Sequence, residues 1–129
     1  MFRFESGGRH HFQGYGEWIV EFTTKGQMKI QQFVGNNLKV DKEFTVKSPE
    51  KETLTKFISE FPLDRVYAST RPGVPDEPQL VFIIQKKTPL NPIEIRIWLN
   101  DATKIPFLKE FLNKIKDSIK IYIGTAPVI

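Results

Sequence analysis

The chain has 129 residues, of which 40% are hydrophobic and 12% aromatic. This is enough for one domain with a core, and it excludes a disordered chain. The absence of cysteine excludes disulfides and thiolate metal sites. It favours a reducing compartment, so we expect a cytoplasmic protein with no signal peptide and no membrane-spanning segment. The net charge of +4 comes mainly from residues 79–129, whose lysines we interpret as a solubilising surface.

The first sixteen residues predict a short strand followed by a turn-rich loop. Phe2 and Phe4 alternate with charged residues, as in a strand with one buried face. Residues 7–16 then contain four of the eight glycines and both histidines, His10 and His11. Adjacent histidines in an extended segment point to opposite faces, so we expect no metal site and interpret both as solvent-facing loop residues.

The next segments predict an antiparallel meander. Apolar residues alternate with polar ones from residue 18 to 23, and again from 38 to 47 after a returning strand that includes Met28 and Ile30. Two turns separate these segments, one around Gly26 and one at Gly35-Asn36-Asn37. Such one-sided alternation is typical of a sheet with one face on the core and one in water.

A helix is expected after the meander. Ser48 is the predicted N-cap, and Pro49 is expected at the first helical position. Apolar residues then recur at helical spacing, which predicts a buried stripe made of Leu54, Phe57, Ile58 and Phe61. Whether residues 63–69 add a short strand is left open.

The loop at residues 70–78 contains three prolines, which exclude a helix and disfavour a strand interior. Pro72-Gly73 fits the centre of a type II turn, in which glycine takes a positive φ. The loop is either a rigid connector or a contact surface, because a stiff loop loses little entropy on binding. Its charged residues Arg71, Asp76 and Glu77 are therefore candidate contact residues.

Residues 80–84 and 93–99 predict two further strands. The first is apolar throughout, as expected for a strand buried on both faces, and the second alternates. Trp98 falls on the polar face, so it either packs under a loop or beside Val81 and Ile83, or it is an exposed contact residue. A second helix is expected from Ile105, and residues 119–123 could be its last turn or a strand.

These elements predict an α+β fold. We expect a single domain over residues 1–129, with an antiparallel sheet of about five to six strands and two helices packed on one face, in the order βββ-α-ββ-α.

The sequence contains no catalytic motif that we can identify. There is no Gly-x-Ser-x-Gly and no phosphate-binding loop, and clustered basic residues with exposed aromatics, as in nucleic-acid sites, are lacking. We therefore predict a non-catalytic binding or protein-interaction domain with no cofactor. Its predicted contact residues are Arg71, Asp76, Glu77, His10, His11 and Trp98. Another protein is the expected partner, and the exposed edges of long strands leave a homodimer open. The alternative is a small hydrolase that uses Asp76 or Glu77 with a histidine.

From the first helix onward the sequence resembles the emfourins, proteinaceous inhibitors of thermolysin-like metalloproteases. The resemblance lies in an amphipathic helix, a loop with Pro75-Asp76-Glu77, two strands, and an acidic-capped helix that begins near Asp101. The opening Phe2-Arg3-Phe4-Glu5-Ser6-Gly7-Gly8 is similar to that family's first strand and Gly-Gly turn. This resemblance implies that the loop at residues 7–16 contacts a protease.

Overall fold

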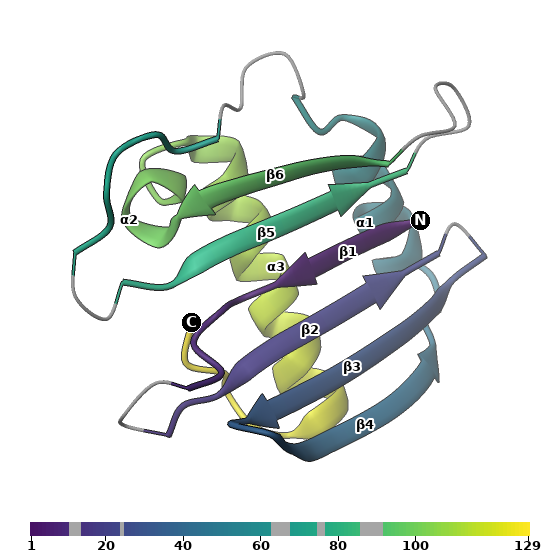
Figure 1. Cartoon of the computed structure of the whole chain (residues 1–129). Helices are drawn as coiled ribbons and strands as arrows, with labels where there is room; N and C mark the ends of the chain where they lie inside the picture. The colour runs from purple at the N-terminus through teal and green to yellow at the C-terminus, as the bar shows by residue number, and fades with distance from the viewer. Residues whose placement is uncertain (11–13, 24, 63–67, 75–76, 86–91) are drawn as a thin grey trace.

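The computed structural model describes residues 1–10, 14–23, 25–62, 68–74, 77–85 and 92–129. Within these ranges it has one six-stranded sheet and three helices (Figure 1). The strands are β1 (Phe2–Glu5), β2 (Glu17–Phe22), β3 (Gln27–Val34), β4 (Asn37–Thr45), β5 (Gln79–Ile84) and β6 (Ile93–Trp98). The helices are α1 (Glu50–Ser59), α2 (Leu99–Ala102) and α3 (Pro106–Ile123).

The sheet is antiparallel throughout, in the order β4-β3-β2-β1-β5-β6. The first strand therefore lies inside the sheet, where it pairs with β2 on one side and β5 on the other. This position joins the N-terminal meander to the β5–β6 hairpin. It also brings the loop that follows β1 close to the loop that precedes β5, although the two are far apart in the sequence.

Both long helices cover the same face of the sheet (Figure 1). The predicted stripe of α1 is partly confirmed, since Leu54 and Phe61 are buried while Phe57 and Ile58 are half-buried against the core. Phenylalanine rings fill the space between sheet and helices, and Phe111 of α3 stacks on a ring of β1 with their centroids 5.0 Å apart. The apolar residues that alternate along the strands therefore pack on this one helix-covered face.

The observed element order is ββββ-α-ββ-α-α, which corrects the prediction in two places. Before α1 there are four strands, one more than in the predicted order. The turn predicted at Gly35 is confirmed, since Gly35 has a φ of 59° and joins β3 and β4 as a hairpin. After β6, α2 forms one extra helical turn. It cannot continue into α3 because Pro106 holds the preceding Ile105 in an extended conformation.

Three local predictions are settled or corrected at the ends of helices and loops. Pro49 takes the N-cap position of α1, and the Ser48 hydroxyl instead hydrogen-bonds the side chain of Glu52, so the predicted serine cap is wrong. Residues 119–123 are the last turns of α3, which ends at Gly124 with a φ of 84°. Most of the ambiguous segment 63–69 lies outside the described residues, and Ala68 and Ser69 are not in a strand.

Among the described residues, no helix covers the other face of the sheet (Figure 1). Charged residues of the strands, among them Arg3, Glu21 and Lys29, alternate with the buried residues and so project onto this face. Two apolar residues on it, Ile19 and Val81, are nevertheless buried beneath their longer neighbours. Arg3 bridges two of those neighbours, with hydrogen bonds to Glu5 and Glu21. We call this side the open face. Within the described ranges, none of the helices is both long and apolar enough to cross a bilayer.

Candidate functional site

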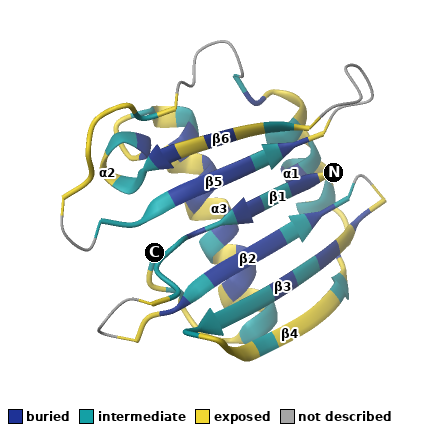
Figure 2. Cartoon of the chain, viewed as in Figure 1, coloured by how far each residue is buried: buried dark blue, intermediate teal, exposed yellow. Residues whose placement is uncertain are grey.

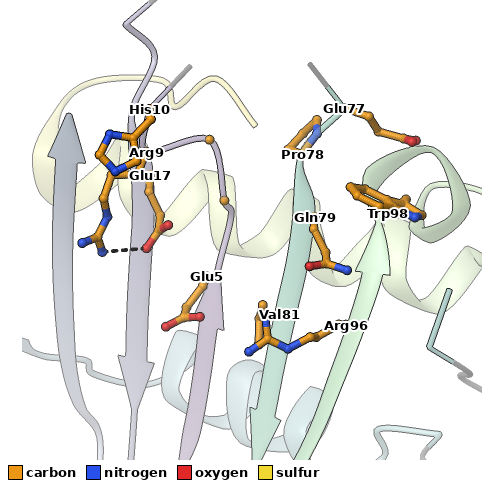
Figure 3. Close-up of a pocket in the computed structure, with 12 residues that line it drawn as sticks. Glu5, Arg9, His10, Glu17, Glu77, Pro78, Gln79, Val81, Arg96 and Trp98 are labelled. Carbon is orange, nitrogen blue, oxygen red and sulfur yellow. Dashed lines mark hydrogen bonds and ion pairs between the residues drawn. The ribbon is translucent and has the colours of Figure 1, made fainter. Parts of the chain in front are cut away.

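A cleft of about 510 Å³ lies on the open face, at the end of the sheet where β1 ends and β5 begins (Figure 3). Its floor comes from the strands and its two walls come from the loops that the sequence marks as irregular. The lining residues are Glu5, Gly7, Gly8, Arg9, His10, Glu17, Glu77, Pro78, Gln79, Val81, Arg96 and Trp98. The N-terminal glycine loop and the proline loop thus face each other across one hollow.

The first wall is the glycine loop, held tightly against the sheet by its backbone. Gly7 and Gly16 have φ values of 70° and 77°, and a Cβ on either would lie 2.6 Å or less from a backbone oxygen of a neighbouring strand. Only glycine meets both conditions. The side chain of Arg9 donates to Glu17 at 3.0 Å and stacks over the ring of Phe33, 4.1 Å from its centroid. These contacts hold the wall in one position.

The second wall is built around Arg71. Its guanidinium donates two hydrogen bonds to the Glu77 carboxylate, at 2.9 and 2.7 Å, and its Nε donates to both oxygens of Asp101 at 3.1 Å. Glu77 also accepts a bond from the backbone N–H of Val74 at 3.3 Å. Although the loop lies at the surface, the Glu77 side chain is only 1% exposed. The charges of this loop therefore bind one another and hold its shape.

Trp98 locks this wall to the end of β6. Its indole N–H donates to the carbonyl of Arg71 at 2.9 Å. Its ring packs on Gly73, where an added Cβ would lie 2.7 Å from a ring carbon. Gly73 does not have the positive φ of a type II turn, so that prediction is wrong. The glycine is required here because it leaves room for the ring. Packing beneath a loop, one of the two alternatives for Trp98, is confirmed.

Ser69 completes the wall and covers the outer edge of β6. Its N–H donates to the carbonyl of Arg96 at 3.1 Å, and its hydroxyl oxygen accepts from the N–H of Trp98 at 3.1 Å. The same hydroxyl donates to Asp101 at 2.7 Å. Two backbone groups of β6 that would otherwise face solvent are thereby satisfied.

The ionised forms of these groups are stabilised by their neighbours. The Arg71 hydrogen bonds lower the pKa of Glu77 below its ordinary value, and the Ser69 hydroxyl, with Arg71, lowers the pKa of Asp101. The two carboxylates in turn raise the pKa of Arg71. A carboxylate held ionised by a bidentate arginine is a weak proton acceptor at neutral pH. The Glu77 network therefore suits a structural role better than proton transfer.

The cleft floor offers hydrogen-bond donors and acceptors that the described residues do not use. Glu5, Val81 and Arg96 are paired in register across three adjacent strands, so a carboxylate and a guanidinium flank a buried apolar residue. Both hydrogen bonds from Arg3 to Glu5 fall on one oxygen of Glu5. Among the described residues, Arg96 bonds only the exposed Glu94 on its own strand, at 3.0 Å. The row can therefore accept ligand hydrogen bonds as well as donate them.

Four of the six predicted contact residues belong to the described part of the chain, and they lie together. His10, Glu77 and Trp98 line the cleft (Figure 3). Arg71 holds the second wall through its bonds to Glu77 and Trp98. The other two, His11 and Asp76, lie outside the described residues.

Sequence reasoning missed the floor of the cleft and the charged residues beside His10 on the glycine-loop wall. Glu5, Arg9, Glu17, Gln79, Val81 and Arg96 were not among the predicted contact residues. The alternation of β1 and β6 marks Glu5 and Arg96 as outward-facing, which is the one signal for them in the sequence. Nothing in that pattern shows that β1 pairs with β5, and this pairing is what joins the two halves of the floor.

In the described ranges, no group of three or more histidine and carboxylate side chains is arranged to hold a metal ion. No protein-family model matches the sequence, and a search of curated proteins found no significant match.

Proposed function

We propose that the protein is a non-catalytic binding domain that recognises a polypeptide in the cleft between residues 7–16 and residues 70–78. The observation that carries the proposal is the lining of the cleft. Paired charges stiffen its walls, while its floor keeps hydrogen-bonding groups that the described residues do not use. Rigid walls reduce the entropy lost on binding.

The mixed charge of the lining favours a peptide over a polyanion. Arg9 and Arg96 are accompanied by Glu5, Glu17 and Glu77, so a run of phosphates would meet carboxylates as well as guanidinium groups. A polypeptide offers amide donors and acceptors together with side chains of either sign. The half-buried ring of Trp98 adds an aromatic contact of the kind enriched at protein interfaces.

A selection experiment tests this proposal. A displayed library of random peptides is selected on the protein, and the enriched peptides are titrated against the wild type, Arg96→Glu and Lys109→Glu. We expect Arg96→Glu to weaken binding about tenfold, because it reverses the charge of the floor, while Lys109→Glu on exposed α3 leaves binding unchanged. No enrichment, or equal binding to all three proteins, contradicts the proposal.

The titration can be followed with one fluorophore. Trp18 is buried in the core, at 2% exposure, whereas Trp98 lines the cleft. In a Trp18→Phe background, the fluorescence of Trp98 reports the occupancy of the cleft directly. A binding signal without a change in Trp98 emission would place the peptide elsewhere.

Inhibition of a thermolysin-like metalloprotease is the second candidate, and it rests on the resemblance to emfourins. It is supported by the position of the glycine loop, whose described residues Gly7–Gly8 and Arg9–His10 form one rim of the cleft and are accessible to a large partner. Mixing the protein in excess with thermolysin and measuring peptide hydrolysis tests it. Unchanged proteolysis removes this candidate and leaves the peptide-binding proposal standing.

The hydrolase alternative and the cytoplasmic location stay predictions. The Glu77 carboxylate is fully engaged by Arg71 and Val74, which leaves Asp76 as the other acid of that hypothesis, outside the described residues.

A further inference from the structure

The two edges of the sheet differ in how the chain covers them, and this difference points to a second interaction surface. The edge of β6 is covered by Ser69, as described above. The edge of β4 pairs only with β3 in the part of the chain that the structure describes. Figure 2 shows β4 as the outermost strand, exposed along almost its whole length.

The alternation of hydrogen bonds along the β3–β4 ladder shows which main-chain N–H and C=O groups of β4 are not used by β3. Val46 N–H bonds the carbonyl of Gly26 at 2.8 Å, directly after β4 ends. In an antiparallel pair every second residue bonds its neighbour, so Phe44 and Lys42 also face β3. The N–H and C=O groups of Asp41, Glu43 and Thr45 then point away from the sheet. This spacing is a template for one more strand.

The side chains of this edge divide by face. Asp41 and Glu43 project onto the open face with Thr45, while Val40 and Phe44 lie on the helix-covered face, half-buried against the core. A strand added to this edge would therefore meet two carboxylates on one face. On the other face it would meet Val40 and Phe44, with the exposed Lys42 between them.

A second copy of this chain fits the edge less well than a segment without carboxylates. In an antiparallel β4–β4 pair centred on Asp41, Asp41 lies against Asp41, although Lys39 then lies opposite Glu43. Centring on Lys42 places Asp41 against Glu43, and centring on Glu43 places Glu43 against Glu43. Like charges directly opposite each other destabilise a strand pair. Registers centred nearer Asn37 involve the part of β4 where its ladder with β3 is irregular, because the register shifts there. Registers centred beyond Glu43 pair only the end of the strand.

The inner neighbour of β4 shows what does fit. Lys29 of β3 lies opposite Glu43, and Gln31 donates to Asp41 at 3.2 Å. On the helix-covered face Met28 lies opposite Phe44. Cationic and amide side chains thus complement the carboxylates on one face, and an apolar side chain complements the other.

We propose that the β4 edge binds an extended segment of another protein that joins the sheet as an additional strand. This segment alternates Lys, Arg or Gln on the open face with apolar residues on the helix-covered face. The main-chain bonds to Asp41, Glu43 and Thr45 supply affinity, and the side-chain pattern supplies selectivity. The site lies at the opposite edge of the sheet from the cleft, so it does not depend on the function proposed above.

The probe is a fluorescein-labelled, end-capped peptide with the sequence of residues 27–32, Gln-Met-Lys-Ile-Gln-Gln, titrated by anisotropy. A second peptide replaces its lysine with glutamate. We expect the lysine peptide to bind and the glutamate peptide to bind about tenfold more weakly, because an attractive cross-strand pair becomes repulsive. The double variant Asp41→Lys, Glu43→Lys should reverse this preference.

Glu43→Pro tests the main-chain bonds. Proline removes an N–H that β3 does not use, so the fold should persist by circular dichroism while binding of the lysine peptide is lost. Binding that survives both Glu43→Pro and the charge reversal overturns the proposal, as does the absence of binding at millimolar peptide. A wild-type dimer that Glu43→Pro dissociates also overturns it, by showing that a second copy occupies the edge.

Discussion

The two edge strands of this sheet show how a tertiary contact changes the meaning of an exposed strand. β6 ends in Trp98, and residues 69–73 fold back over it with main-chain, hydroxyl and aromatic contacts. β4 is longer and more exposed, and β3 is its only strand partner among the described residues. The end of the β6 edge is closed by the chain's own loop, whereas the described residues leave the β4 edge uncovered, with Asp41 and Glu43 along it.

This comparison also explains the charged residues and the glycine in the described part of the loop at residues 70–78. Its arginine, glutamate and glycine are used to hold the loop against β6 and α2. The described part of the loop is thus more than a connector, because it closes an edge and forms a wall of the cleft in the same structure.

The largest effect should come from Gly16→Ala, in the wall opposite this loop. A Cβ at residue 16 would lie 2.5 Å from the carbonyl oxygen of Phe33, and its φ of 77° is unfavourable for alanine. The strain of the left-handed backbone and the overlap together should cost about 3 kcal/mol of unfolding free energy, measured by urea denaturation.

Gly14→Ala is the matched control, because Gly14 has a φ of 74° with open space around it, and it should cost only about 1 kcal/mol. Equal losses would mean that the wall is not packed against β3.

Ser69→Ala should uncover the outer edge of β6 at Trp98, so that this edge resembles the uncovered edge of β4. The N–H of Trp98 loses its acceptor, and the unfolding free energy should fall by about 1 kcal/mol. Hydrogen exchange provides the direct measurement, since the Trp98 amide should then exchange nearly as fast as the outward-facing amide of Glu43. Ser59→Ala removes an exposed hydroxyl bond within α1 and serves as the control, with little expected change. A Trp98 amide that stays protected in Ser69→Ala would show that other contacts close this edge.

The smallest effect concerns pH. Glu77 and Asp101 have pKa values below their ordinary values of 4.5 and 3.8. Their ionised forms thus stabilise the native state above those values, and this stability is lost as the pH falls through the lowered values. The indole N–H signal of Trp98 should shift below about pH 4.5, as protonation of Glu77 and Asp101 breaks their contacts with Arg71. Glu77→Gln should weaken these contacts at pH 7 and flatten this acid response. Glu60→Gln is the control, because it removes one negative charge outside the loop. An identical acid response in Glu77→Gln and Glu60→Gln would mean that other carboxylates cause the transition.

The sequence by itself determined the fold class and most of the elements. The alternation in β2 and β4, the stripe of α1 and the buried run of β5 each follow from a local periodicity, which tertiary contacts reinforce. The element order was less well predicted. It left out one of the four N-terminal strands, although the turn at Gly35 was predicted, and it missed α2, because the effect of Pro106 on its predecessor is decided within one or two residues.

The tertiary structure alone decided what the irregular segments do. Arg71, Glu77 and Trp98 were predicted as contact residues, but their hydrogen bonds to one another depend on β6 and α2 lying beside the loop. Gly73 shows the difference most clearly. Its sequence context predicts a glycine chosen for a positive φ, whereas the fold uses its missing side chain to seat a tryptophan ring from a distant strand. Periodicity reports which face of an element is buried, but only strand order brings distant residues together into a cleft or leaves an edge unpaired.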